Sequence, residues 1–150
     1  FLFEPNSDSA YEPVGIGGSN SGRLYIGNSS SFADVFRNSR LAGAATSGYF
    51  SSTGVQLASI VSNKTANTYK IFKDGGSDVF TSGQTASATA ALFDDTKNMR
   101  LGSTTKTPSH HLKGWLYEVL VFDEPLSNAN LNAVGNYISA VYGTSYTDIT

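Results

Sequence analysis

Apolar and polar residues follow one another in short blocks along this chain, and the last third carries the clearest pattern. Residues 115–122 are aromatic or β-branched except for two leucines and one glutamate, which is typical of a strand that is covered on both faces. Pro125 follows closely, and proline cannot donate to a β-ladder and keeps its predecessor out of the α region. The pattern therefore predicts a strand over 115–122 that ends in a turn.

A short amphipathic helix is predicted directly after this turn. Ser127 is suited to cap its first turn, with Leu126 and Leu131 placed to form a hydrophobic staple. Residues at three- and four-residue spacing form one apolar stripe, namely Leu131, Val134, Ile138 and Val141. Gly143 is expected to end the helix. Because Gly135 and four asparagines give this segment poor helix propensity, packing against the rest of the domain must stabilise it.

Upstream of residue 114, short apolar blocks are separated by clusters of Gly, Ser, Asn and Thr, which is typical of an all-β sandwich or barrel. Strands are expected at residues 1–4, 14–17, 23–26, 32–37, 55–61, 68–73 and 99–102. The strands at 14–17 and 23–26 are expected to pair as a hairpin. Residues 74–76, Asp-Gly-Gly, predict a second hairpin that returns through 77–81.

Composition and length narrow the class of protein. The chain has 150 residues, 39% hydrophobic and 15% charged, with a net charge of -2. These values describe one globular domain that has no electrostatic attraction for nucleic acid or an anionic membrane. No apolar run approaches the roughly 18 residues of a membrane-spanning helix, and the absence of cysteine excludes a disulfide or a thiolate metal site. Since Phe1 falls inside an expected strand, we expect the domain to lack its first strand or strands and to belong to a longer chain.

The C-terminal pattern resembles the signature of a known family. An apolar strand with an embedded Glu118 leads through Leu126-Ser127 into a short helix that closes with Tyr142-Gly143. This order is similar to the end of laminin-G-like jelly-roll domains, which belong to the concanavalin A-like lectin/glucanase superfamily. The resemblance implies that residues 1–150 form a single all-β domain, with two antiparallel sheets packed as a jelly-roll sandwich and one short C-terminal helix.

Glycoside hydrolases of this superfamily need a pair of carboxylates. Retaining enzymes hold the two groups about 5 Å apart across one glycosidic bond. This chain has four glutamates, and the turn expected at Asp123 separates Glu118 from Glu124, so these two are not expected on one strand face. The Glu-x-Asp-x-x-Glu run of the glucanases is missing. We therefore predict no enzymatic activity, and a glycoside hydrolase is the least favoured function.

Two residues of the predicted strand are expected to be structural. Glu118 shares a strand face with apolar neighbours, where an ionised carboxylate needs partners. We expect it to accept hydrogen bonds from backbone amides or from a base such as Arg100, and the alternative is a ligand or metal contact. Trp115 alternates with Tyr117 on the other face, and we expect it in the core.

Metal binding has one candidate, a calcium site. Asp94 and Asp95 lie in an expected loop, and domains of this fold often hold calcium at such rims. Calcium takes roughly six to eight oxygens, however, and two adjacent aspartates point in different directions. A solvated loop is therefore favoured, and no cofactor is expected unless it is calcium.

Glycan recognition is the predicted function. A pyranose stacks its apolar face on an aromatic ring while polar side chains bind its hydroxyls. The aromatic candidates are Tyr49, Phe50 and Tyr11, all in expected loops, and Asn28 and Arg23 are the polar candidates. Packing at the sandwich edge is the alternative for each aromatic. The expected partners are glycans or cell-surface polysaccharide and neighbouring domains or subunits, at an extracellular or virion surface, without nucleic acid and without membrane insertion.

A purely structural virion module, such as a fibre, tail or capsid-decoration domain, is the alternative function. Low charge and abundant Ser, Thr, Gly, Ala and Asn favour it. Opposite its apolar stripe the predicted helix carries Asn128, Asn132 and Asn136, and an uncharged face of this kind suits a protein contact better than solvation. We expect these three asparagines to contact a neighbouring chain or domain.

Overall fold

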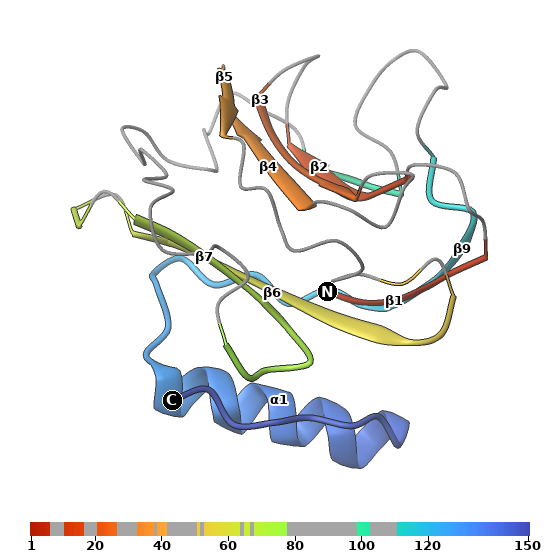
Figure 1. The fold of residues 1–150 in the computed structure, drawn as a ribbon, viewed down its shortest axis with the longest axis vertical. Coiled ribbons are helices and arrows are strands. Elements are labelled where there is room, and N and C mark those ends of the chain that lie inside the picture. Colours follow the sequence, from red (N-terminus) through yellow and green to blue (C-terminus); the bar gives the residue numbers. More distant parts are fainter. Residues whose placement is uncertain are drawn as a thin grey trace.

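The computed structural model describes residues 1–6, 11–16, 21–26, 33–37, 39–41, 51, 53–63, 65–66, 68–77, 99–102 and 111–150. The elements within these ranges are β1 (Leu2–Pro5), β2 (Tyr11–Ile16), β3 (Ser21–Ile26), β4 (Ala33–Arg37), β5 (Ser39–Leu41), β6 (Gln56–Asn63), β7 (Thr68–Lys73), β8 (Met99–Leu101), β9 (Gly114–Glu118) and α1 (Asn128–Tyr142) (Figure 1). Antiparallel strands followed by one C-terminal helix are thus confirmed.

The described strands pair into two sheets. One has the order β7-β6-β1-β9 and the other the order β5-β4-β3-β2-β8. In the first sheet β1 is central, because Leu2 pairs with Leu57 of β6 and Phe3 pairs with Leu116 of β9. Strands from both ends of the sequence therefore meet in one sheet, which places the C-terminal third against the N-terminal strand.

The second sheet contains the predicted hairpin, with Val14 of β2 opposite Leu24 of β3. The expectation that Tyr11 lies in a loop is wrong, because β2 begins at this residue. Pro13 falls where the register shifts, between Tyr11 and Val14, and the ladder of β2 with β8 starts only at Val14. A proline without an N–H group is tolerated at such an irregularity, so the strand continues through it.

The strand predicted over 115–122 is shorter in the structure. The ladder between β9 and β1 ends at the pair of Glu118 with Leu2, so the apolar residues that follow lack this hydrogen-bonding partner. Three of these residues are exposed, namely Leu120, Val121 and Phe122. The apolar run predicts too long a strand, because a strand ends where its hydrogen-bonded pairing with the neighbouring strand ends and not where the apolar run ends.

The helix α1 lies across one face of the four-stranded sheet (Figure 1), and its buried side chains form the described core with that sheet. One cluster joins Ile138 of α1 to Leu2 and Leu57. The other joins Leu131 to Phe72 of β7 and to Ile149. Burying one such side chain contributes about 1.5–3 kcal/mol, which supplies the tertiary packing that this sequence of low helix propensity requires.

The structure confirms the predicted apolar stripe of α1 except at Val141, which is exposed. Its side chain is 55% exposed, whereas Leu131 and Ile138 are buried. With 3.6 residues in each turn, Val141 lies roughly 60° around the helix from Ile138, which turns it away from the sheet. Gly135 occupies the buried side instead.

Both predicted helix ends are confirmed. The Ser127 hydroxyl accepts a hydrogen bond from Asn130 N at 3.2 Å, and Leu126 packs against the cluster that contains Leu131. Gly143 has a φ of 66° and donates its N–H to Ser139 O at 2.9 Å. This left-handed residue reverses the chain, so the segment 144–150 runs back along α1 (Figure 1).

This C-terminal segment also contacts the turn at 74–76. Thr147 N donates to Asp74 O at 2.9 Å, and Gly76 N donates to Thr147 O at 2.8 Å. The φ values of Asp74, Gly75 and Gly76 are 51°, 78° and 72°, as a tight turn requires. The predicted return strand lies largely outside the described residues, and the contact that the structure describes at this turn is with the tail.

We predict that Gly135→Ala destabilises the fold, although alanine favours a helix by about 1 kcal/mol. A Cβ at residue 135 would lie 2.1 Å from ring atoms of Tyr146, and overpacking of this kind costs about 1–3 kcal/mol. The free energy of unfolding, measured by urea denaturation, should therefore fall.

The matched control is the same change in a Tyr146→Ala background. Without the ring, Gly135→Ala should stabilise the protein by up to about 1 kcal/mol. A gain in stability in both backgrounds would contradict the packing of Tyr146 on Gly135.

Candidate functional site

The glycan-binding residues predicted from sequence are only partly described. Tyr49, Phe50 and Asn28 lie outside the described residues, and for Tyr11 and Arg23 the structure gives the backbone. Tyr11 pairs with Ile26, whereas Arg23 pairs with Gly15, four positions further along β2. At about 3.3 Å per residue these two positions are roughly 13 Å apart along the strand, so the register does not bring them together.

The predicted calcium residues Asp94 and Asp95 also lie outside the described residues. Within the ranges that are described, no group of three or more His, Cys, Asp or Glu side chains could hold a metal ion. In the same part of the chain, no helix combines the length and apolar character needed to cross a membrane.

Trp115 is exposed, and the prediction that it lies in the core is wrong. Its side chain is 57% exposed and that of Tyr117 is 43% exposed. The alternation along β9 was correctly predicted, but the face was not, because Leu116 lies opposite the fully buried Phe3. The face of β9 that carries Trp115 and Tyr117 therefore reaches solvent.

These rings form part of an aromatic surface, which we define as Trp115, Tyr117 and Tyr142 with the carboxylate of Glu4. The Tyr117 hydroxyl donates to Glu4 Oε2 at 2.6 Å, and Glu4 lies opposite Trp115 in the ladder. The rings of Tyr117 and Tyr142 are tilted by 54° with their centroids 6.1 Å apart, a favourable aromatic pairing. β1, β9 and the last turn of α1 thus meet at one surface.

Carboxylates raise the pKa of both tyrosines. The hydrogen bond to Glu4 is the main cause for Tyr117, with smaller effects of desolvation and of the Glu4 charge. For Tyr142 the main cause is the hydrogen bond to Glu118, followed by desolvation and the charge of Glu118. In each pair the phenol donates and the carboxylate accepts, because a phenolate beside a carboxylate would be repelled.

Glu118 is half-buried, and its described partner is a side chain of α1. Its carboxylate forms the hydrogen bond that raises the pKa of Tyr142. The Arg100 side chain, a partner that the sequence suggested, lies outside the described residues. Within the described residues, the buried Oε2 atom of Glu118 has no hydrogen-bond partner. The residue therefore joins β9 to the end of α1.

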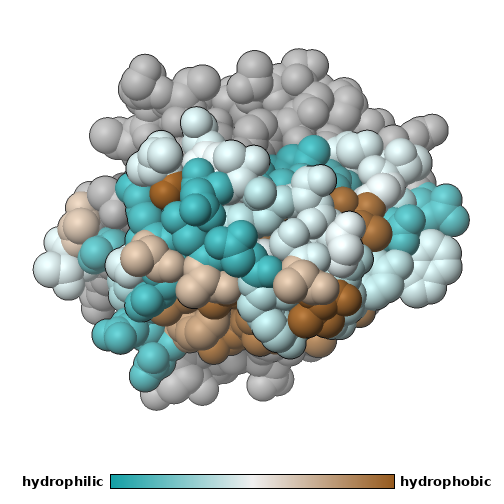
Figure 2. All heavy atoms as spheres, turned by 90° about the horizontal axis from the view of Figure 1, so that it is seen from below, coloured by the Kyte–Doolittle hydropathy of each residue, from teal (hydrophilic) through white to brown (hydrophobic). Residues whose placement is uncertain are grey.

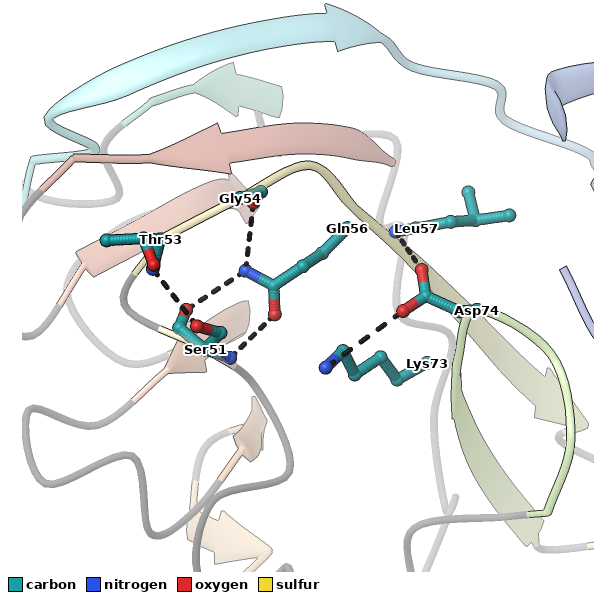
Figure 3. Close-up of polar contacts among 7 residues, drawn as sticks. All are labelled: Ser51, Thr53, Gly54, Gln56, Leu57, Lys73 and Asp74. Carbon is teal, nitrogen blue, oxygen red and sulfur yellow. Dashed lines mark hydrogen bonds and ion pairs between the residues drawn. The ribbon is translucent and has the colours of Figure 1, made fainter. Parts of the chain in front are cut away.

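A second polar cluster lies at the start of β6 (Figure 3). The buried Gln56 side chain accepts from Ser51 N at 2.6 Å and donates to Ser51 O at 2.9 Å and to Gly54 O at 3.4 Å. Three hydrogen bonds satisfy this buried amide, as burial requires. Gln56 fixes the chain at Ser51, the residue that follows the predicted glycan contact Phe50 in sequence.

Asp74 holds the turn after β7 onto β6. Its Oδ1 accepts from Leu57 N at 2.8 Å, and its Oδ2 is 4.0 Å from Lys73 Nζ (Figure 3). Desolvation raises the pKa of this carboxyl, while the Leu57 hydrogen bond and the Lys73 charge act in the opposite direction. Because these groups occupy the carboxylate, we assign it a structural role.

Comparisons of the chain with protein-family models, curated proteins and solved structures find no match. The family resemblance of the C-terminal pattern therefore stays a prediction.

The aromatic surface has the chemistry of a binding site. Trp115 supplies an exposed ring, while Glu4 and the Tyr117 hydroxyl supply polar groups beside it. Seen from the side of α1, the protein surface is a mixture of hydrophilic and hydrophobic patches (Figure 2). A ligand that has both an apolar face and hydrogen-bonding groups fits such a surface better than a wholly apolar ligand does.

We predict that Glu4→Gln lowers the pKa of Tyr117 toward the ordinary tyrosine value of about 10. The change removes the charged acceptor that favours the protonated phenol. Because the folded-state pKa is raised, the stabilisation from this pair is complete below about pH 10. It is lost as the pH rises through the raised pKa.

The measurement is an ultraviolet absorbance titration of tyrosinate in the wild type and in Glu4→Gln. Tyr117→Phe identifies the contribution of this one phenol, and Tyr137→Phe serves as the control for an exposed tyrosine of α1. Superimposable titrations of the wild type and Glu4→Gln would show that the hydrogen bond does not form in solution.

Proposed function

We propose that this chain is a non-catalytic module for glycan recognition and adhesion in a larger extracellular or virion protein. We further propose that its two sheets pack as the jelly-roll sandwich of concanavalin A-like, laminin-G-like domains. Support for this fold comes from sheet orders in which distant strands are neighbours, such as β1 beside β9 and β2 beside β8. The helix with the expected caps at Ser127 and Gly143 agrees with it.

The observation that carries the function is the exposure of Trp115 beside Tyr117 and Glu4. A large aromatic ring that is 57% exposed contributes little to folding, yet covering a large apolar side chain is worth about 1.5–3 kcal/mol. Because Trp115 is 57% exposed, a ligand that covers it gains part of this free energy on binding. Exposed aromatic residues gathered beside polar groups are typical of sites that recognise a ligand.

A saccharide matches the groups on this surface. The apolar face of a pyranose stacks on an aromatic ring, and its hydroxyls can donate to the Glu4 carboxylate next to Trp115. The unused Oε2 acceptor of Glu118 is buried, so we assign direct contact to Glu4 only. One ring and one carboxylate give weak binding to each sugar, and adhesion then requires several copies acting together.

A structural module that works through protein contacts is the second candidate. The exposed apolar residues Leu120, Val121 and Phe122 follow directly after β9, and aromatic anchors are also enriched at protein interfaces. This function predicts that the aromatic surface is covered by another subunit and not by a sugar. Substitutions at Trp115 should then weaken assembly and leave glycan binding undetected.

We predict that the wild-type protein binds saccharides on a glycan array and that Trp115→Ala reduces the affinity about tenfold or more. A tenfold loss corresponds to about 1.4 kcal/mol, within the range expected for losing one stacking ring. Trp115→Phe should retain most of the binding. Tyr137→Ala, which removes an equally exposed ring from α1, should have no effect.

A Tyr49→Ala variant separates the two proposed locations of the site. Loss of binding in Tyr49→Ala, with Trp115→Ala unaffected, would move the site to the residues expected from sequence. An array without any signal, together with loss of assembly in Trp115→Ala, would favour the structural module over glycan recognition.

A further inference from the structure

The C-terminal segment 144–150 is bound in the way a receptor binds a peptide. The side-chain amide of Asn132 contacts both main-chain groups of one residue, because Ile149 N donates to Asn132 Oδ1 at 2.8 Å and Asn132 Nδ2 donates to Ile149 O at 3.1 Å. A paired contact of this kind holds an extended peptide through its backbone, whatever side chain the peptide carries there. Asn132 is one of the three asparagines that the sequence predicted to contact a neighbouring chain or domain, and here it contacts the C-terminal segment of its own chain.

The turn after β7 binds the other side of the segment. Thr147 forms an isolated parallel bridge with Gly75, and its N–H and C=O groups contact Asp74 and Gly76. A Cβ at Gly75 would lie 1.8 Å from Thr147 O, so this close approach requires glycine. The segment is thus held at the turn by main-chain hydrogen bonds, which do not depend on its side chains.

Two side chains of the segment are anchored between α1 and the sheet. The Tyr146 ring lies on Gly135, and its hydroxyl donates to Asn132 Oδ1 at 3.0 Å. Ile149 is 5% exposed and packs with Phe72 and Leu131. The surface between α1 and the turn at 74–76, which we call the groove, thus fits a tyrosine and an isoleucine three positions apart.

Polar contacts add specificity at the edge of this groove. Asn136 Nδ2 donates to Asp148 Oδ1 at 3.1 Å, so the groove also accepts a carboxylate directly before the isoleucine. The Ser139 hydroxyl donates to Thr144 O where the tail begins. Asn132 and Asn136, two of the asparagines on the uncharged polar side of α1, thus contact the segment 144–150.

We propose that this groove, formed by α1 and the turn at 74–76, also binds the C-terminal segment of a second copy of the chain. The groove and the tail are shown to be complementary, and the same contacts form whether the tail comes from the same copy or from another. Only residues 143–145 connect the helix to Tyr146, and Gly143 provides the bend. Exchange of such an element between identical copies is a low-cost route to association.

Because the connection is short, the exchange depends on the concentration of the protein. A segment joined by a short linker has an effective concentration on the order of millimolar at its own groove, so dilute copies keep their own tails. When copies are held side by side in an assembly, the local concentration of a neighbour's tail is comparable to the effective concentration of the copy's own tail. The tails then link neighbouring subunits. This inference does not depend on glycan recognition, because the groove uses none of Trp115, Tyr117 or Glu4.

Cysteine crosslinking between two copies tests the proposal directly, because the chain has no cysteine of its own. One full-length copy carries Asn136→Cys and the other carries Asp148→Cys; both residues are exposed and contact each other across the groove. Mixed at about 1 mM under mild oxidation, the two should form a disulfide-linked heterodimer at least tenfold faster than a control pair. The control replaces Asn136→Cys by Asn128→Cys, which is exposed on the same helix.

A crosslinking rate no faster than that of the control pair would overturn the proposal.

A second measurement uses two variants with complementary defects. The first variant carries Asn132→Ala and Gly135→Ala, which block the groove and leave the tail intact. The second carries Tyr146→Ala and Ile149→Ala, which leave the groove intact and remove the two side chains that anchor the tail. Each should remain monomeric, and the mixture should give a 1:1 heterodimer by light scattering. A mixture of folded variants that stays monomeric would equally overturn it.

Discussion

Packing of α1 on the four-stranded sheet is the contact on which the described structure depends. The helix has no charged residue within its bounds, and no acidic or basic group complements its ends, so neither ion pairs nor its macrodipole interactions stabilise it. Its stability comes from burial of Ile138 against Leu2 and Leu57 and of Leu131 against Phe72. Because Leu2 belongs to β1, the same contact ties the N-terminal strand to the C-terminal third of the chain.

Local signals in the sequence predicted the boundaries of the helix. Ser127 and Gly143 act on their immediate neighbours, and the turn at 74–76 is encoded by residues that accept positive φ, so a linear pattern is sufficient for all three. The antiparallel hairpin of β2 and β3 was predictable for the same reason. Register irregularities were not, because the shift beside Pro13 depends on which strand lies opposite.

The aromatic surface was not predicted, because alternation along a strand does not show which of its faces is covered. Trp115 belongs to an apolar run that indicates a strand buried on both faces, but the face of β9 that carries Trp115 and Tyr117 remains open. Likewise, local propensity makes Gly135 unfavourable in a helix by about 1 kcal/mol. Only the tertiary structure shows why glycine is needed, because the ring of Tyr146, eleven residues later, occupies the space that a Cβ would fill. Sequence did identify the asparagine side of α1 as unusual, yet could not show that two of its amides bind the tail of the same chain.

The helix connects the two surfaces to which functions are assigned. Its last residue, Tyr142, contacts Tyr117 and Glu118 at the aromatic surface, and the next residue, Gly143, begins the reversal that leads into the groove. The position of Tyr142 is therefore held by β9, and the docked tail begins directly after it. A tail that docks on a second copy need not disturb the first contact, because the chain can change direction at Gly143 without moving the helix. The hinge thus lets one copy join another while its aromatic surface keeps its shape.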